Sequence, residues 1–154
     1  MANTFTANLN LAKPSAGDLN WENEYTDFVE AVDDLGNLLT MNIPVPGNAV
    51  DEAIIFEGFA PQEDITVKAI GIFAKTAPTG AALQIDLLRD GSEVADLATL
   101  APAATYEKTT LATPQNFLST ERLGLKIKQV GSTVAGADLI VTIYFQKKAI
   151  ASSS

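Results

Sequence analysis

Apolar and polar positions follow two different periods along the chain, and the change between them falls near residue 40. In residues 13–39 the apolar side chains recur every three to four positions, which places them on one stripe of an α-helix. After about residue 43, short apolar runs alternate with polar residues and are separated by turn residues, as is typical of β-strands. The pattern therefore predicts one amphipathic helix followed by a β-domain. The helical stripe consists of Trp21, Tyr25, Phe28, Val32 and Leu35.

The predicted helix covers residues 19–35 and has a capping residue at each end. Asp18 is a suitable N-cap, and Gly36 stands where a left-handed C-cap residue is wanted. A helix of about 17 residues is marginal in isolation, so its apolar stripe must be covered. Three covers remain open: the β-domain of the same chain, a trimeric seam with other copies, or a groove in a partner.

The segment before the helix reads as an extended arm. Residues 1–17 carry the scattered apolar side chains Phe5, Leu9 and Leu11 among Thr, Asn and Ala, and Pro14 interrupts the backbone. Such a segment does not bury enough surface to fold alone. We expect these three residues, together with the five residues of the helical stripe, to bind a partner or another copy of the chain.

The rest of the chain predicts an antiparallel β-sandwich. Pro44 and Pro46 indicate a linker or an edge strand, because proline donates no hydrogen bond to a sheet. Asp90-Gly91 lies between two strand patterns and predicts a tight hairpin. We expect an arm and helix in residues 1–42, a sandwich in 43–150 and a tail in 151–154. Strands are expected at 53–59, 65–75, 81–89, 93–100, 105–111, 122–129 and 138–148.

Composition removes several classes of protein. Of the 154 residues, 47% are hydrophobic, which excludes a globally disordered chain. No apolar run approaches the roughly 18 residues of a membrane helix, so we expect no membrane partner. The first residues lack the basic start and apolar core of a secretory signal. We therefore expect a protein that is made and used without export.

Catalytic chemistry has little support in the sequence. The chain has no cysteine and no histidine, which excludes Ser-His-Asp and Cys-His nucleophiles and most transition-metal sites. Asp90, Glu93 and Asp96 are candidate calcium ligands, although turn acids more often bond the local backbone. Asp86 and Glu107 are candidates for a hydrolase pair, although strand acids usually mark a solvent face. We expect no enzyme, no cofactor and no metal.

Charge is distributed unevenly along the chain. The net charge is −9, and residues 1–60 hold ten acids against one base, whereas residues 61–154 hold nine of each. Nucleic-acid binding needs a basic patch, and the chain offers only the pair Lys147-Lys148, so we expect no nucleic-acid partner. The acidic first part is either a solvated face or a surface that docks on a basic protein.

Aromatic side chains leave a carbohydrate-binding role open. Trp21 lies on the helical stripe, whereas Tyr106, Phe117 and Tyr144 fall in or beside expected strands. Core packing is the more common use of aromatic residues in a sandwich, and we expect it here. Carbohydrate binding is kept as an alternative.

Two stretches resemble virion proteins of tailed bacteriophages. LAKPSAGDLNWENEYTDFVEAVD (11–33) is similar to the N-terminal attachment segments of phage fibre and decoration proteins. LGLKIKQVGSTVAGADLIVTIYF (123–145) resembles the closing strands of jelly-roll-like domains in phage head and tail appendages. Together they cover about a third of the chain. The resemblance implies a jelly-roll-like domain in a homo-oligomer, usually a trimer, that belongs to the virion and is assembled in the host cytoplasm.

Among such proteins, the chain best fits a capsid decoration or cement protein. It has no long shaft between helix and sandwich, and its acidic arm suits docking on a capsid lattice. The expected partner is the major capsid protein or another virion protein. The alternative is a tail-fibre or head-fibre component that binds a receptor or carbohydrate.

Overall fold

The computed structural model describes residues 38–147, apart from the side chains of Ala95 and Asp96. These residues are built of β-strands, and none of them lies in a helix that is long and apolar enough to cross a membrane. The predicted arm and helix fall in residues 1–37 and lie outside the described part, so they stay predictions. The strands are β1 (Leu38–Asn48), β2 (Ile54–Phe59), β3 (Ile65–Thr76), β4 (Leu83–Arg89), β5 (Ser92–Leu100), β6 (Tyr106–Phe117), β7 (Leu123–Gln129) and β8 (Ala137–Lys147).

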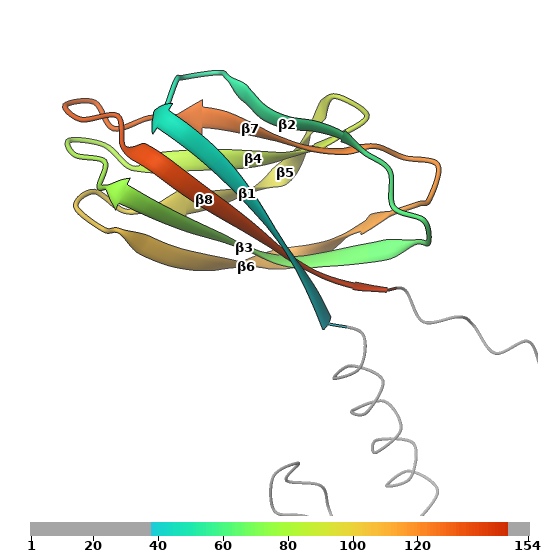
Figure 1. Ribbon diagram of the computed structural model, residues 1–154. Coiled ribbons are helices and arrows are strands. Elements are labelled where there is room, and N and C mark those ends of the chain that lie inside the picture. The colour runs from blue at the N-terminus through green and yellow to red at the C-terminus, as the bar shows by residue number, and fades with distance from the viewer. Residues whose placement is uncertain (1–37, 148–154) are drawn as a thin grey trace, which may run out of the picture. The chain divides into compact units, whose positions relative to one another are not determined.

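The strands form two four-stranded sheets that pack face to face (Figure 1). Sheet 1 has the order β1-β8-β3-β6, and sheet 2 has the order β2-β7-β4-β5. The pairs β4–β5, β3–β6, β2–β7 and β1–β8 are therefore nested, like the two arms of one long hairpin folded over itself. Only the β4–β5 connection stays within a sheet. The predicted antiparallel β-sandwich is confirmed at this level.

The core lies between the sheets, and alternation along each strand supplies it. On β8, Leu139, Val141 and Ile143 are buried, while Ile140 and Thr142 point to the other face. The same alternation holds on β4, where Leu83, Ile85 and Leu87 belong to the core. Burial of large side chains from both sheets is the main force that holds the sandwich together. The largest fully buried side chains include Phe117, Ile70, Ile72, Leu83, Ile85, Leu87, Leu100, Leu123, Leu125, Ile127 and Leu139.

The predicted Asp90-Gly91 hairpin is present and joins β4 to β5. Arg89 and Ser92 are partners in the sheet, and the two turn residues have φ values of 50° and 79°. Positive φ at both central positions is the signature of a type I′ turn, which matches the twist of the flanking strands. The turn is hydrogen-bonded to the loop between β6 and β7, because the Asp90 amide donates to the Arg122 carbonyl.

Strand β6 runs six residues beyond the predicted end at Leu111. The added residues include Pro114, which has no N–H to donate to a ladder. In the structure β6 is an edge strand, and its pairing with β3 jumps from Thr110 to Gln115. The proline thus lies in a bulge, where no ladder hydrogen bond is needed.

Strand β1 forms the other edge of sheet 1, which decides between the linker and edge-strand interpretations of Pro44 and Pro46. It begins at Leu38, so the boundary that we placed between residues 42 and 43 falls within a strand. The Thr142 hydroxyl donates to the Asn42 side chain, and the Gly47 amide donates to Asp138. This antiparallel register puts the start of β1 and the end of β8 at the same end of the sandwich (Figure 1).

Candidate functional site

The residues that the sequence singled out for attachment and oligomer contacts lie outside the described part of the chain. The structure therefore leaves their role as a prediction. They are Phe5, Leu9, Leu11, Trp21, Tyr25, Phe28, Val32 and Leu35.

Two of the three candidate calcium ligands near the β4–β5 turn, Asp90 and Glu93, bind other parts of the protein, and the side chain of the third, Asp96, lies outside the described part. Asp90 Oδ1 accepts a hydrogen bond from the Arg122 amide at 2.8 Å. Glu93 accepts hydrogen bonds from the ammonium groups of Lys126 and Lys128. Among the residues and side chains that the structure describes, no three acids, histidines or cysteines gather as metal ligands. The local-backbone interpretation of Asp90 is thus the one that the geometry supports.

The two candidate hydrolase carboxylates are not brought together. Asp86 lies on β4 in sheet 2, whereas Glu107 lies on β6 in sheet 1. Glu107 Oε2 accepts a hydrogen bond from the Ala101 amide, which ties the end of β5 to β6. Neither residue lines the groove or the pocket described below.

Asp86 is buried, whereas its position in the sequence predicted a solvent-exposed face. It points away from the core, because its neighbours Ile85 and Leu87 are core residues, yet it is only 2% exposed. Its Oδ1 atom is buried without a hydrogen-bond partner. Burial, and next the negative charge of Glu93, raise the pKa of Asp86 to about 6.

A network of charged side chains surrounds Asp86 on the outer face of sheet 2. Lys126 pairs with both Glu52 and Glu93, and Lys128 pairs with the same two carboxylates. The hydrogen bonds that Lys126 donates lower the pKa of both Glu52 and Glu93, and donation to these carboxylates raises the pKa of Lys126 and, through Glu93, that of Lys128. Because these charges pair with one another, the network has a structural role. It links the loop before β2, strand β7 and strand β5.

The aromatic residues divide between the core and the outer face of sheet 1. Phe117 is fully buried, as expected. The expectation of core packing was wrong for Tyr106, which is 55% exposed, and for Tyr144, which follows the outward register of β8. The physical reason is the register: Tyr106 pairs with the exposed Phe73 on β3, so both rings point away from the core.

The two tyrosines meet above Gly71 of β3, the strand that lies between theirs. A Cβ atom at Gly71 would lie 3.3 Å from Cε2 of Tyr144, so the glycine leaves the space that this ring occupies. The hydrogen bond with Tyr144 is the main cause that raises the pKa of Tyr106. The Lys108 ammonium lies 4.1 Å from the centroid of the Tyr144 ring, a cation–π contact.

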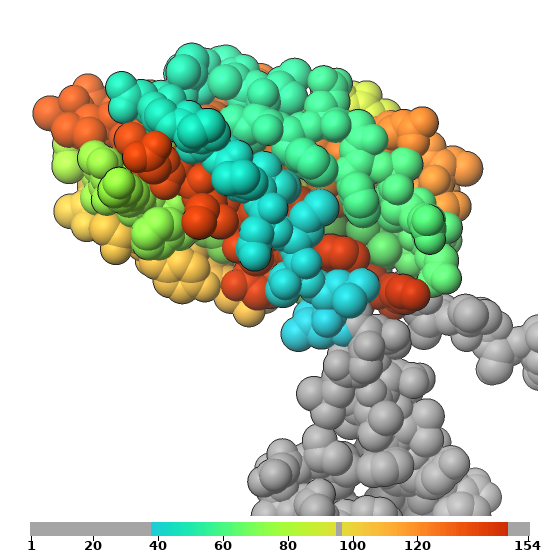
Figure 2. Space-filling model, viewed as in Figure 1, coloured from blue at the N-terminus to red at the C-terminus, as the bar shows by residue number. Residues whose placement is uncertain are grey.

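An apolar groove of about 370 Å³ continues this face toward β1. Phe73 forms one wall, and Ile140 lies beside it as its partner on β8. Lys75 and Asp138 supply the polar groups at its rim. Figure 2 shows this face, with β1, β8 and β3 side by side. The other lining residues are Pro44, Val45, Pro46 and Leu139.

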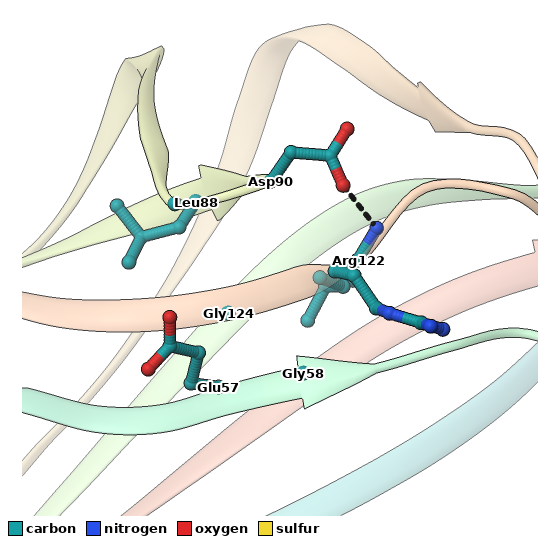
Figure 3. A pocket seen from close by; sticks show the side chains of 8 residues that line it. Glu57, Gly58, Leu88, Asp90, Arg122 and Gly124 are labelled. Atoms are coloured by element: carbon teal, nitrogen blue, oxygen red, sulfur yellow. Dashed lines mark hydrogen bonds between the residues drawn. The ribbon is translucent and has the colours of Figure 1, made fainter.

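A second hollow of about 410 Å³ lies on sheet 2, near the β4–β5 turn. Figure 3 shows the Glu57 and Asp90 carboxylates at its rim, with the Arg122 side chain pointing away from Asp90. Gly124 and Leu88 form its floor, and a Cβ at Gly124 would lie 3.0 Å from the Phe56 carbonyl oxygen. The hollow has only two acids at its rim, and one of them, Asp90, already accepts a hydrogen bond from the Arg122 amide. This set does not indicate a catalytic centre.

Comparisons with known proteins add little beyond the fold. No protein-family model and no curated protein matches the chain. Among solved structures, the nucleoplasmin-like N-terminal domain of Drosophila FKBP39 is similar at 14% identity and a TM-score of 0.39, covering 76% of this chain and 94% of that one. A family 35 carbohydrate-binding module from Clostridium thermocellum is similar at 10% identity and a TM-score of 0.43, covering 72% and 92%.

A third similar structure is dimeric latent PorU from Porphyromonas gingivalis, at 16% identity and a TM-score of 0.31, with 72% of this chain and 10% of that one covered. At such low scores, none of the three informs the ligand or partner of this chain.

The outer face of sheet 1 is therefore the site that sequence reasoning missed. Its signal was present in the alternation of β8, where Ile140 and Tyr144 occupy the register opposite to the core residues. Aromatic residues on the solvent register of two strands of one sheet indicate a binding face more strongly than aromatic content does. Chemically, this face offers ring surfaces, phenol hydroxyls and ammonium groups, a set suited to binding.

Proposed function

We propose that this chain is a non-catalytic structural protein of a tailed-phage virion, a capsid decoration or cement protein whose sandwich is a jelly roll. The nested strand pairs support the jelly roll, because two interlocked Greek keys in eight strands give such nesting. Jelly rolls occur in viral capsid proteins and lectins, among others. In this proposal, residues before β1 attach to the major capsid protein, and a homo-oligomer, most simply a trimer, stiffens the lattice.

The observation that carries the proposal is the position of the two chain ends of the sandwich. β1 starts and β8 ends at one end, as the contacts Asn42–Thr142 and Gly47–Asp138 require. The opposite end is closed by four loops that hydrogen-bond to one another through their backbones, for example Ala103 to Pro78. A rigid body with both connections at one end suits a module that is held there and projects its loops.

The test is removal of the attachment segment with the sandwich left whole. The deletion should end at residue 37, because β1 begins at Leu38 and a longer deletion would remove part of an edge strand. The shortened protein should unfold at an unchanged temperature and lose its binding to purified capsids. Deletion of residues 148–154, which follow β8 in the sequence, is the matched control and should leave binding intact. Equal occupancy of capsids by both deletions would refute the attachment role.

A second experiment addresses the predicted helical stripe. Replacing Trp21 and Phe28 together by Ala should weaken capsid binding by several kcal/mol if both are buried at the contact, since aromatic anchors dominate interface energies. Asn23→Ala, off the stripe, is the control. An acidic segment that docks electrostatically should also bind less tightly as salt rises, whereas a flat salt response would indicate apolar contact alone.

One observation favours a second candidate, a tail-fibre or head-fibre component that binds a receptor. Phe73 and Tyr106 expose ring surface on sheet 1, where no part of the described chain covers them. Decoration alone does not require such a face. A receptor-binding protein should label host cells as a soluble trimer, and a cement protein should label only capsids.

A further inference from the structure

The outer face of sheet 1 carries a single row of apolar side chains that crosses its strands. Phe73 on β3 is the direct partner of both Ile140 on β8 and Tyr106 on β6. All three are large apolar residues with exposures of 42%, 41% and 55%. Pro44 and Pro46 of β1 extend the row through the groove beside Ile140. We call Phe73, Tyr106 and Ile140, two aromatic residues and one aliphatic residue, the aromatic row.

The positions next to the aromatic row are polar. The neighbouring row consists of Thr142, Gly71 and Lys108, and Thr142 is hydrogen-bonded to Asn42 of β1. Tyr144 crosses this row above Gly71 and brings its hydroxyl to that of Tyr106. The aromatic row thus has hydrogen-bonding groups along one side, together with the Tyr144 ring.

Positive charge brackets the aromatic row. Lys108 lies on one side and Lys75 on the other, and neither forms an ion pair with any acid that the structure describes. The acid at this rim, Asp138, accepts a hydrogen bond from the Gly47 amide. In a chain of net charge −9 this face is an exception. An anionic group on either side of the row would therefore meet one ammonium group that forms no ion pair with a described acid.

We propose that the aromatic row and its flanking groups bind a short acidic oligosaccharide. The C–H faces of sugar rings pack on Phe73 and Tyr106, the hydroxyls of Tyr106 and Tyr144 exchange hydrogen bonds with sugar hydroxyls, and Lys108 or Lys75 pairs with a sugar carboxylate. The aromatic row spans two strand spacings, about 9.5 Å, and the prolines of β1 extend it to three spacings, about 14 Å, a length that suits a linear ligand lying across the strands.

A folded protein partner fits this face less well. A stable protein interface takes about 800 Å² from each partner and has an apolar centre several residues wide. The aromatic row has polar groups directly beside it, because Lys108 and Thr142 flank Gly71 and the Tyr144 ring over Gly71 carries a hydroxyl. The narrow strip with polar edges is closer to the pattern of ligand sites, where a few placed polar groups fix the orientation of a ligand.

The experiment titrates the full chain with two acidic probes, trigalacturonic acid and sialyllactose, and with their neutral counterparts, maltotriose and lactose, by calorimetry and amide NMR. At least one acidic probe should bind and shift amide signals of β3, β6 and β8, and its neutral counterpart should bind at least tenfold more weakly. Tyr106→Ala should weaken acidic binding at least tenfold, and Lys108→Met should reduce the preference for the acid. Arg122→Met, which removes a positive charge from the hollow on sheet 2, is the matched control and should change nothing.

Three results would overturn the proposal. Neither acidic probe binds at millimolar concentration, or the shifted signals lie on sheet 2, or the chain proves to be an oligomer in which the aromatic row is buried. Unfolding temperatures of each variant identify a loss of fold, and Tyr106→Phe, which keeps the ring, should bind more tightly than Tyr106→Ala. This site does not depend on capsid attachment, since the titration involves no capsid and the deletion of residues 1–37 leaves sheet 1 whole.

Discussion

The Tyr144 ring lies over Gly71 of β3, between the strands of Tyr144 and Tyr106, and the interaction with Tyr144 raises the pKa of Tyr106. The two residues are 38 positions apart in the chain and come from strands that are not paired with each other in the sheet. The glycine between them supplies the space, and Lys108 contacts the Tyr144 ring. This pair is the part of the outer face that is most easily tested without a ligand.

Tyr144→Phe should lower the pKa of Tyr106. The hydrogen bond favours the protonated phenol and raises its pKa above the ordinary value, so loss of the Tyr144 hydroxyl should let the pKa fall back toward about 10. NMR of ring-labelled tyrosine against pH measures this. Tyr25→Phe assigns the remaining signal and should leave the Tyr106 titration unchanged. A Tyr106 titration that is the same with and without the Tyr144 hydroxyl would contradict the hydrogen bond.

Asp86→Asn should stabilise the protein at pH 8 and have little effect at pH 4. The pKa of Asp86 is about 6 in the folded protein and near 3.9 in an unfolded chain, so the folded state binds the proton more tightly. The stability from this group is complete below about pH 4 and is lost as the pH rises through 6. With a discount for solvent screening, the gain at pH 8 is about 2 kcal/mol.

Thermal unfolding of wild type and Asp86→Asn at several pH values checks this prediction. The unfolding temperatures should separate by roughly 5–10 °C at pH 8 and converge below pH 4.5. Glu57→Gln, at an exposed carboxylate of sheet 2, is the control and should parallel wild type. If wild type and Asp86→Asn showed the same pH dependence, the buried carboxyl would not be the group that titrates.

Gly91→Ala should destabilise the β4–β5 hairpin by about 1 kcal/mol, because alanine is strained at the φ of 79° found there. Denaturant unfolding measures the change. Ser92→Ala, at the first residue of β5, is the neighbouring control and should cost much less. A neutral Gly91→Ala would mean that the turn adopts another type in solution.

Phe117→Ala should be among the most costly substitutions in the sandwich, at about 3–5 kcal/mol. Phe117 is fully buried, and the Arg89 guanidinium lies 4.9 Å from its ring centroid. Leu118→Ala tests an exposed apolar residue next to it and should stay within about 0.5 kcal/mol. Chemical denaturation at neutral pH compares the two, and similar losses would place Phe117 outside the core.

Local patterns predicted the strands well because their causes are local. Period-2 alternation identified Leu139, Val141 and Ile143 as core residues, and Asp90-Gly91 identified a turn that needs positive φ. The end of β6 was missed because it depends on the pairing of β6 with β3, which is not a local feature. Pro114 forbids a regular ladder hydrogen bond, and its own sequence neighbourhood does not reveal that β6 lies at an edge with a bulge.

The candidate site could not be predicted in the same way. Alternation predicts two faces for each strand but not what lies across from an outward side chain. Asp86 looked like an ordinary acid on a solvent face, yet Glu93 from β5 and the lysines of β7 gather around it. The residues named from sequence for attachment lie in the part that the structure does not describe, and they remain predictions.

By itself, the sequence determined that the chain after about residue 40 is a β-sandwich, that the Asp90-Gly91 turn joins two strands, that alternating residues such as Leu139, Val141 and Ile143 fill the core, and that the chain lacks the cysteine and histidine used in most catalytic centres. Only the tertiary structure decided that Phe73, Tyr106 and Ile140 form one row and that Asp86 is buried. The reason is the nested strand order. It pairs residues as far apart as Asn42 and Thr142, and such pairings depend on how the whole chain packs its core.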